Sequence, residues 1–353
     1  MDDFLIGKRL IGKDHKPFII AELSGNHGGS LDRALDLVKS AAATGADAVK
    51  FQTYTPDTIT IKSDREEFLI NDPSSLWHGR TLYDLYEEAH TPWEWHAPMF
   101  ELARNLGIEV FSSPFDLSSV DFLEDLDVSA YKIASLEISD VQLIKKVAQT
   151  KKPLIMSTGA AKLEDIENAI KIARENGAAK IILLKCTSAY PALPEDANLR
   201  SMATLSRLFN CHVGLSDHTL GTAVSIASIA LGASVIEKHF IDDKSFKTVD
   251  SSFSLDHDEF KFLVDQANIA WESLGNESIM SSTSESTSIS HKRSIYVVED
   301  IKKGDIFSYK NLKSIRPGNG LAVKHLEDFI GKKSRTSIRK GTPLKWTNLA
   351  DEN

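Results

Sequence analysis

Short apolar segments alternate with longer segments at helical spacing between residues 18 and 275, and this alternation constrains the fold most strongly. The first unit is a strand, FIIAEL, followed by a helix, LDRALDLVKSAAATG, for which Ser30 is a suitable N-cap and Gly45 a suitable end. Further units follow, and the last helix is DHDEFKFLVDQANIAWESLG. Eight strand and helix units over roughly 250 residues predict a (β/α)8 barrel.

The alternative architecture is a doubly wound open sheet of parallel strands. Nucleotide-binding sheets of that type carry a GxGxxG motif after the first strand, and the pair Gly28-Gly29 is too short to be one. We therefore predict an α/β fold, a TIM barrel over residues 1–275. Within it, residues 1–17 alternate apolar and polar side chains around a Gly/Lys/Asp turn, which predicts a small hairpin.

Two segments interrupt the alternation. Residues 55–92 form a long insertion between the second strand and its helix, and long loops on the carboxyl side of a barrel are usually functional. Residues 276–290 are rich in serine and threonine, which is typical of a linker or an exposed loop. Residues 291–353 contain short β-like runs among turns such as KKGD and RPGNG, which indicates a small, loop-rich β module.

The net charge of -9 argues against binding to nucleic acid or to an anionic membrane surface, so an anionic substrate would need a local basic pocket. Cys186 and Cys211 lie in no CxxC or Cys/His zinc spacing, so neither a disulfide framework nor a structural zinc is indicated. We read no secretion signal in MDDFLIGKRL and no membrane-spanning run, and we therefore expect a cytoplasmic protein.

Histidines stand at the ends of two predicted strands that one helix joins, within residues 212–240. Because side chains alternate along a strand, Ser216 and His218 share one face, as do Glu237 and His239. If the strands are parallel neighbours, both imidazoles emerge at the carboxyl edge of the sheet. Two neutral imidazoles there can hold a divalent metal with positions left for water and substrate. The alternative is a pair of hydrogen-bonded histidines at a loop edge.

Polar side chains also stand at the ends of the other predicted strands, where the barrel interior should otherwise be apolar. They are Glu22, Asn26, His27, Lys50, Gln52, Ser112, Ser113, Lys132, Ser135, Glu137, Ser157, Thr158, Lys185, Thr187, Ser188 and Tyr190. A buried lysine requires a charged partner or an anionic ligand. Three lysines among hydroxyls therefore suggest bound phosphate or carboxylate, although each lysine could instead pair with Glu22 or Glu237.

Glu22 is the candidate for acid/base chemistry, and a salt bridge at the barrel mouth is its alternative role. A site of this composition suits a metal that polarises a carbonyl next to an anionic substrate. A Schiff-base aldolase with Lys132 or Lys185 as nucleophile is a second enzyme class that these residues allow. A non-enzymatic alternative makes residues 291–353 a carbohydrate- or ice-binding domain on a structural barrel.

Short motifs occur along the chain in the order AELSGNH, AVKFQTY, FSSPFD, YKIAS, STG, CTSAYP, GLSDHT and EKHF. In this order and spacing they resemble the motifs of the sialic acid synthase family. RSIYVVEDIKKGD and RPGNGL resemble the antifreeze-like (SAF) domain of that family. The resemblance covers nearly the whole chain. It implies a TIM barrel with a small C-terminal SAF domain, in an enzyme that condenses phosphoenolpyruvate with an amino sugar.

Carried over position by position, the resemblance implies a role for each matching residue. His218 and His239 would bind Mn²⁺ or Mg²⁺, and they would be catalytic together with Glu22, which would serve the aldehyde end of the sugar. Phosphoenolpyruvate would contact Lys50, Ser113, Lys132, Ser135, Ser157, Ser188 and Ser216. The sugar would contact Gln52, Glu137, Tyr190, Asp250 and Arg316. Arg316 would come from the other subunit of a domain-swapped homodimer, unless it is an ordinary surface arginine.

Within the family, LWHGRTLYDLYEEAHTPWEWH most resembles pseudaminic acid synthases, which implies 2,4-diacetamido-2,4,6-trideoxy-L-altrose as the sugar. Departures from the N-acetylneuraminate branch at Ser24, Ser112, Ser113, Lys185 and Ser188 argue against N-acetylmannosamine. Aromatic side chains of this segment offer apolar area for a deoxy sugar, or they form a small core of their own. They are Trp77, Tyr83, Tyr86, Trp93 and Trp95. N-acetylneuraminate and legionaminate synthases remain as alternatives.

Overall fold

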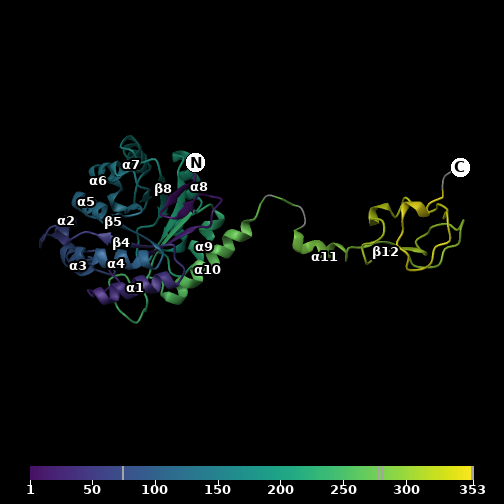
Figure 1. Ribbon diagram of the computed structural model, residues 1–353, viewed down its shortest axis with the longest axis horizontal. Coiled ribbons are helices and arrows are strands. Elements are labelled where there is room, and N and C mark those ends of the chain that lie inside the picture. Colours follow the sequence, from purple (N-terminus) through teal and green to yellow (C-terminus); the bar gives the residue numbers. More distant parts are fainter. Residues whose placement is uncertain (74, 277, 280–281, 351–353) are drawn as a thin grey trace. The chain divides into compact units, whose positions relative to one another are not determined.

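The computed structural model describes residues 1–73, 75–276, 278–279 and 282–350 (Figure 1). The chain divides into two compact units, Met1–Gly275 and Asn276–Asn353. Every barrel strand belongs to the first unit. In the described part of the chain, no helix is long and apolar enough to cross a membrane.

Eight parallel strands close into a barrel in the first unit, in the order β10-β3-β4-β5-β6-β7-β8-β9. The strands are β3 (Phe18–Glu22), β4 (Ala48–Thr53), β5 (Glu109–Pro114), β6 (Tyr131–Ile133), β7 (Leu154–Ser157), β8 (Ile181–Cys186), β9 (His212–Asp217) and β10 (Val235–His239). The barrel closes where β10 pairs with β3, and His239 lies opposite Glu22 there. An open sheet would leave this edge unpaired, so the predicted (β/α)8 barrel is confirmed.

A helix follows each barrel strand and covers the outside of the sheet (Figure 1). The helices are α1 (Leu31–Ala43), α4 (Trp93–Asn105), α5 (Leu117–Asp125), α6 (Val141–Gln149), α7 (Leu163–Glu175), α8 (Ser201–Phe209), α9 (Ala223–Ala230) and α10 (His257–Leu274). In α6 the buried residues recur at helical spacing, as Leu143, Ile144, Val147 and Ala148. Helix α1 begins at its predicted cap, because the Ser30 side chain accepts a hydrogen bond from N of Arg33 at 3.4 Å.

The amino-terminal hairpin lies at the end of the barrel opposite to the predicted site. Strands β1 (Phe4–Ile6) and β2 (Arg9–Ile11) pair antiparallel. Nε of Arg9 lies 3.1 Å from Oδ1 of Asp47, the residue before β4. The hairpin therefore packs against the amino ends of the strands, and the residues that could do chemistry stand at the other end.

The insertion between β4 and α4 has secondary structure of its own. It contains α2 (Pro56–Ile59), a 3-10 turn at Glu66–Phe68 and α3 (Leu82–Ala89). Nε1 of Trp77 donates a hydrogen bond to O of Val249 at 3.2 Å. This bond joins the insertion to the loop that follows β10, at the carboxyl end of the barrel.

The second unit is small and rich in loops. Strands β11 (Ser294–Val297) and β12 (Leu312–Ile315) pair antiparallel, and α11 (Ser286–Ile289) precedes them. Among the described residues of this unit, 3-10 turns lie at Thr283–Glu285, Val323–His325 and Trp346–Asn348, and the first unit has two more at Leu136–Ser139 and Pro194–Ala197. The core of the second unit consists of Ile295, Val297, Ile301, Phe307, Leu312, Phe329, Ile338 and Leu344. The prediction of a small β module after the barrel is confirmed.

Candidate active site

Four charged side chains from four strands meet inside the carboxyl end of the barrel. Glu22 on β3 forms an ion pair with Lys50 on β4, its partner in the sheet register. Oε1 of Glu237 on β10 lies 3.9 Å from Nζ of Lys50 and 3.8 Å from Nζ of Lys132 on β6. Ser216 donates a hydrogen bond to the same oxygen at 3.0 Å. The four charged side chains are at most 7% exposed, and we call them the charge cluster.

Burial is the largest influence on how the charge cluster titrates. It raises the pKa of Glu22 above its ordinary value, and Lys50 offsets this in part. It lowers the pKa of Lys132 against the attraction of Glu237. Burial also acts to lower the pKa of Lys50, but the two glutamates outweigh it and the pKa is raised. Glu22 therefore takes up a proton more readily than a carboxylate in water, as an acid/base residue requires.

Serine hydroxyls surround the charge cluster. Oγ of Ser113 accepts a hydrogen bond from Nζ of Lys50 at 3.2 Å. Oγ atoms of Ser157 and Ser188 are buried, and neither has a hydrogen-bond partner among the residues that the structure describes. A buried hydroxyl without a partner is unfavourable unless a ligand supplies one. These two hydroxyls therefore indicate where polar atoms of a ligand would bind.

Gly159, in the loop after β7, lets the hydroxyls of two of the serines approach its backbone. Its N–H donates a hydrogen bond to Oγ of Ser135 at 3.1 Å. A Cβ at this position would lie 2.3 Å from Oγ of Ser188 and 2.8 Å from Oγ of Ser135. Any side chain would displace both hydroxyls, so the predicted serine positions depend on this glycine.

His218 and His239 lie side by side, with ring centroids 5.3 Å apart. Nδ1 of His218 lies 2.9 Å from O of Thr187, and in the neutral ring donation of a proton to that carbonyl would leave the lone pair on Nε2. Burial acts to lower the pKa of His218, but contact with Cys186 outweighs it and the pKa is raised, so a cation would displace a proton from this ring. Nδ1 of His239 is buried and has no hydrogen-bond partner in the described part of the chain. Burial and the nearby His218 hold the pKa of His239 well below its usual value, so its ring is neutral, the form that binds a metal.

This histidine pair fits a divalent cation that keeps open positions. Within the described residues, no group of three or more His, Cys, Asp and Glu side chains is arranged to hold a metal. A cation at His218 and His239 would therefore take two nitrogens from this chain and the rest of its ligands from water and substrate.

Cys186, and not Lys185, faces the site from β8. Cys186 is in register with Ser216, and its Sγ lies 3.9 Å from Nδ1 of His218. Lys185 is in register with Leu215, and its Nζ donates to O of Cys186 at 2.8 Å. Because side chains alternate along a strand, the inference that three lysines face the site is wrong for Lys185. Burial opposes ionisation of the thiol, but contact with His218 brings the pKa of Cys186 to about 7.

A cavity of about 480 Å³ reaches His239 of the histidine pair. Its barrel side is lined by Ser24, Gln52, Ser135, Glu137, Ser188, Tyr190, His239 and Asp250. All of these except Ser24 are predicted site residues, so the structure brings the predicted sugar contacts of the barrel into one cavity. A cavity of about 530 Å³ lies at the opposite end of the barrel, beside Met1, Arg174 and His212, and it contains no predicted site residue.

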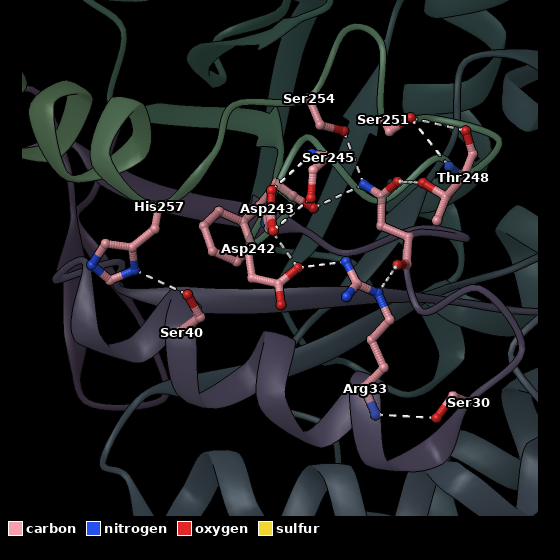
Figure 2. Close-up of polar contacts among 12 residues, drawn as sticks. Ser30, Arg33, Ser40, Asp242, Asp243, Ser245, Thr248, Ser251, Ser254 and His257 are labelled. Carbon is pink, nitrogen blue, oxygen red and sulfur yellow. Dashed lines mark hydrogen bonds and ion pairs between the residues drawn. The ribbon is translucent and has the colours of Figure 1, made fainter.

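Polar contacts fix the loop between β10 and α10, which carries the buried Asp250 (Figure 2). Figure 2 shows Arg33 of α1 pointing at Asp242, and Nη2 lies 2.6 Å from Oδ1. Asn26, whose carbonyl accepts from Nε of Arg33 at 3.2 Å, donates to Oγ of Ser254 at 2.9 Å. These bonds join the loops after β3 and β10 and hold Asp250 at the cavity.

The aromatic residues near the insertion do not all face the cavity. Trp77 and Tyr86 line it. The hypothesis that five aromatic side chains serve the sugar is wrong for the other three, which are Tyr83, Trp93 and Trp95. Trp93, for example, stacks on Phe122 with ring centroids 4.7 Å apart, and Phe122 packs against the core of the barrel unit.

Lys238 is a buried lysine for which the sequence predicts no role. Its Nζ lies 2.9 Å from Oδ2 of Asp217 and donates to O of Thr219 at 2.6 Å. It stands between Glu237 and His239, so alternation turns it to the outer face of the strand. This lysine holds the ends of β9 and β10 together. Alternation alone gives its direction, but only the structure gives its partner.

Arg316 is the one predicted site residue outside the barrel unit. It is exposed in the second unit and precedes a cis peptide bond to Pro317. Its contact with the sugar, from the other subunit of a homodimer, stays a prediction.

Comparison with known proteins identifies the family. A profile of the NeuB family matches residues 37–279, and a profile of the SAF domain matches residues 292–350. The chain is 48% identical over 332 residues to the pseudaminic acid synthase of Campylobacter jejuni strain 81-176, with 94% of this chain and 96% of that one covered. It is 40% identical over 325 residues to the N,N'-diacetyllegionaminic acid synthase of Campylobacter jejuni strain NCTC 11168, with 90% and 95% covered.

A solved structure shows the same architecture. The spore coat polysaccharide biosynthesis protein of Bacillus subtilis is 32% identical, has a TM-score of 0.67 and is matched over 100% of both chains. The NeuB profile covers more than half of the sequence, and relatives well above 30% identity extend over nearly all of it. The chain therefore belongs to the NeuB family, the sialic acid synthase family.

Proposed function

We propose that the chain catalyses pseudaminic acid synthesis, the condensation of phosphoenolpyruvate with 2,4-diacetamido-2,4,6-trideoxy-L-altrose to a nine-carbon 2-keto sugar acid with release of phosphate. The observation that carries this proposal is the buried charge cluster next to the histidine pair, with unpartnered serine hydroxyls beside it. Identity of 48% to a pseudaminic acid synthase, against 40% to a legionaminic acid synthase, supports the choice of sugar.

Phosphoenolpyruvate would bind at the two lysines of the charge cluster, Lys50 and Lys132. Its carboxylate and phosphate need cations and hydroxyl donors in a site shielded from water. The donors we assign to it are Ser113, Ser135, Ser157, Ser188 and Ser216. Glu22 and Glu237 hold both lysines in place before the anion arrives, so little reorganisation is needed on binding.

We place the divalent cation, Mn²⁺ or Mg²⁺, at His218 and His239. Bound there, it would supply Lewis acidity toward the sugar aldehyde. The polar contacts to the rest of the sugar would come from Gln52, Glu137, Tyr190 and Asp250, all of which line the cavity.

The reaction follows from this placement of the two substrates. The methylene carbon of phosphoenolpyruvate attacks the aldehyde carbon of the open-chain sugar, and the former enol carbon becomes electron-deficient. Water adds to that carbon, and Glu22 takes one of its protons and passes it to the former aldehyde oxygen, which becomes a hydroxyl group. The adduct then expels phosphate by cleavage of its carbon-oxygen bond, the second water proton leaves with the phosphate, and the ketone remains. Lys50 and Lys132 balance the negative charge on the phosphate and carboxylate throughout.

We also propose that the enzyme is a domain-swapped homodimer. Exposed leucines follow the carboxyl ends of five successive barrel strands, in the connecting loops or at the start of the next helix or 3-10 turn, namely Leu117, Leu136, Leu163, Leu193 and Leu220. A ring of exposed apolar side chains around a cavity marks a surface that another protein covers. We assign this surface to residues 276–350 of a second copy, which would bring the exposed Arg316 to the anionic substrates.

Synthesis of N-acetylneuraminate or legionaminate uses the same chemistry on a different sugar. A Schiff-base aldolase is the alternative from another class, and the lowered pKa of Lys132 favours it. Borohydride reduction in the presence of substrate would trap an adduct on Lys132 in an aldolase and leave a phosphoenolpyruvate-condensing enzyme unmodified.

The test of the proposed function is phosphate release from phosphoenolpyruvate with a panel of open-chain amino sugars. We expect release, together with a nine-carbon product detected by mass spectrometry, with 2,4-diacetamido-2,4,6-trideoxy-L-altrose. N-acetylmannosamine should give little product. Release with N-acetylmannosamine alone would contradict the proposal and favour N-acetylneuraminate synthesis.

A further inference from the structure

The two sides of the 480 Å³ cavity differ in chemistry. Barrel strands and their loops supply the polar side, which includes Gln52, Glu137 and Asp250. The insertion supplies a mainly apolar side, which we call the insertion wall. Its apolar and aromatic members are Ile59, Ile70, Trp77, Leu82, Leu85 and Tyr86, and Asp72 and Ser75 of the insertion also line this side. A ligand in this cavity would therefore contact donors and acceptors on one side and hydrocarbon on the other.

Trp77 connects the insertion wall to the rest of the site through a hydrogen bond and a ring contact. Its indole N–H donates to O of Val249 at 3.2 Å, and Val249 precedes Asp250. Its ring centroid lies 5.9 Å from that of Tyr190, whose ring lies 4.4 Å from that of His218. The indole face is thus held at a fixed position relative to the histidine pair, and its polar atom is already satisfied.

The position of the reacting carbon determines which end of the sugar meets this wall. Carbon-carbon bond formation requires the aldehyde at the histidine pair, next to the charge cluster. The opposite end of the open chain then extends through the cavity toward Trp77 and its neighbours. A hydroxyl group against the indole of Trp77 and the aliphatic side chains would lose its hydrogen bonds to water without replacement, whereas a methyl group there would gain by burial.

We propose that the insertion wall, through Trp77, selects sugars whose far end is a methyl group over sugars that carry a hydroxyl group there. Trp77 is a specificity-determining residue in this assignment. The insertion is the element by which the enzyme discriminates 6-deoxy from 6-hydroxy sugars. The inference rests on the proposed function. It adds the residue and the chemical group by which the substrate is chosen.

The test compares kcat/KM for 2,4-diacetamido-2,4,6-trideoxy-L-altrose with that for the same sugar bearing a 6-hydroxyl group. Wild type should prefer the deoxy sugar by at least about 10-fold, as one buried methyl group allows. Trp77→Ala should reduce the preference to about threefold or less, because water then reaches the far end of the cavity. Trp77→Phe keeps an apolar ring but loses the bond to Val249, and should retain most of the preference.

Trp93→Ala is the matched control, because Trp93 stacks on Phe122 and does not line the cavity. It should leave the ratio of the two sugars unchanged even if it lowers thermal stability. If Trp77→Ala fails to fold, Ile59→Ser introduces a hydroxyl group into the same wall and should also reduce the preference. The KM for phosphoenolpyruvate should stay at the wild-type value in every folded variant, because that substrate binds at the charge cluster.

A folded Trp77→Ala or Ile59→Ser enzyme with the wild-type preference would overturn the inference. The failure of the proposed function would be recognised separately, since wild type would then release no phosphate with either diacetamido sugar. That outcome would remove the inference together with the function on which it rests.

Discussion

Ser24 donates a hydrogen bond to Oδ2 of Asp250 from a left-handed backbone with φ of 46°. A residue with a Cβ loses roughly 1–2 kcal/mol in this conformation, which glycine adopts freely. Nε2 of Gln52 donates to Oγ of Ser24 at 3.3 Å, so the serine hydroxyl joins β4 to the loop after β10. Strain of this kind beside a cavity points to a role for the hydroxyl in binding.

Two substitutions at position 24 distinguish the effect of the strained backbone from the effect of the hydroxyl group. Ser24→Gly relieves the strain, whereas Ser24→Ala keeps it, so Ser24→Gly should be the more stable by roughly 1 kcal/mol in urea unfolding. Both remove the bond to Asp250 and should raise the KM for the sugar about 10-fold, with the KM for phosphoenolpyruvate unchanged. A Ser24→Gly enzyme with the wild-type KM for the sugar would show that the hydroxyl has no part in binding.

Removal of one partner from the Glu22 and Lys50 pair should cost more stability than removal of both. Lys50→Met leaves Glu22 buried without its cation and should lower the free energy of unfolding by roughly 3–5 kcal/mol. The double variant Lys50→Met with Glu22→Gln should regain most of that loss but remain inactive. Lys39→Met, which removes an exposed ion pair with Asp36, is the control and should change stability by less than about 1 kcal/mol. Wild-type affinity for phosphoenolpyruvate in Lys50→Met would contradict the assigned binding site.

Two buried histidines outside the charge cluster predict how stability depends on pH. Burial lowers the pKa of His27 and of His96 from 6.5 to about 4. Below pH 6.5 the unfolded chain takes up protons that the folded chain does not accept until about pH 4, so stability falls as the pH falls. Each histidine lowers the free energy of unfolding by at most about 1.4 kcal/mol for each pH unit of acidification in this window.

A variant at one of these histidines tests the prediction. His96→Gln removes a titrating group while it keeps an amide to bond with Thr53, the present partner of Nε2 at 2.8 Å. Its melting temperature should decrease less between pH 6.5 and pH 4.5 than that of wild type. Equal slopes for the two proteins would mean that His96 is not kept neutral by the fold.

Mixing two inactive variants tests the swapped dimer. Arg316→Ala has an intact barrel, and His239→Ala has an intact second unit. After dissociation and random reassociation, about one quarter of wild-type activity should return, because half of the dimers are mixed and each mixed dimer holds one complete site. A mixture that stays inactive although mixed dimers form would contradict a role for Arg316 across the subunits.

Alternation along the strands predicts much of the site from the sequence. It fails where the sequence does not show which residues of a strand face the inside of the barrel. His218 just after β9, His239 of β10 and the lysines of β4 and β6 fall on the inward face as expected. On β8 the inward-facing residues are displaced by one position from those expected, so Cys186 takes the place expected for Lys185. The apolar runs do not reveal this, because each strand of the barrel is buried on both faces.

Features that depend on contacts between distant segments could not be read from the sequence. Trp77 and Trp93 look alike in the sequence, but only Trp77 reaches the cavity, through a bond to a loop far along the chain. The strained backbone of Ser24 is likewise invisible until Asp250 is placed beside it. Both cases arise because tertiary contacts, not local pattern, decide the direction of a side chain.

The most direct measurement is phosphate release by protein stripped with EDTA and then assayed with and without added Mn²⁺. Wild type should be inactive after stripping and recover with Mn²⁺, since His218 and His239 offer two imidazole nitrogens beside the substrates. His239→Ala should neither recover nor bind Mn²⁺ in equilibrium dialysis. Full turnover by the stripped wild type, or an active His239→Ala enzyme, would contradict a cation held by these two histidines.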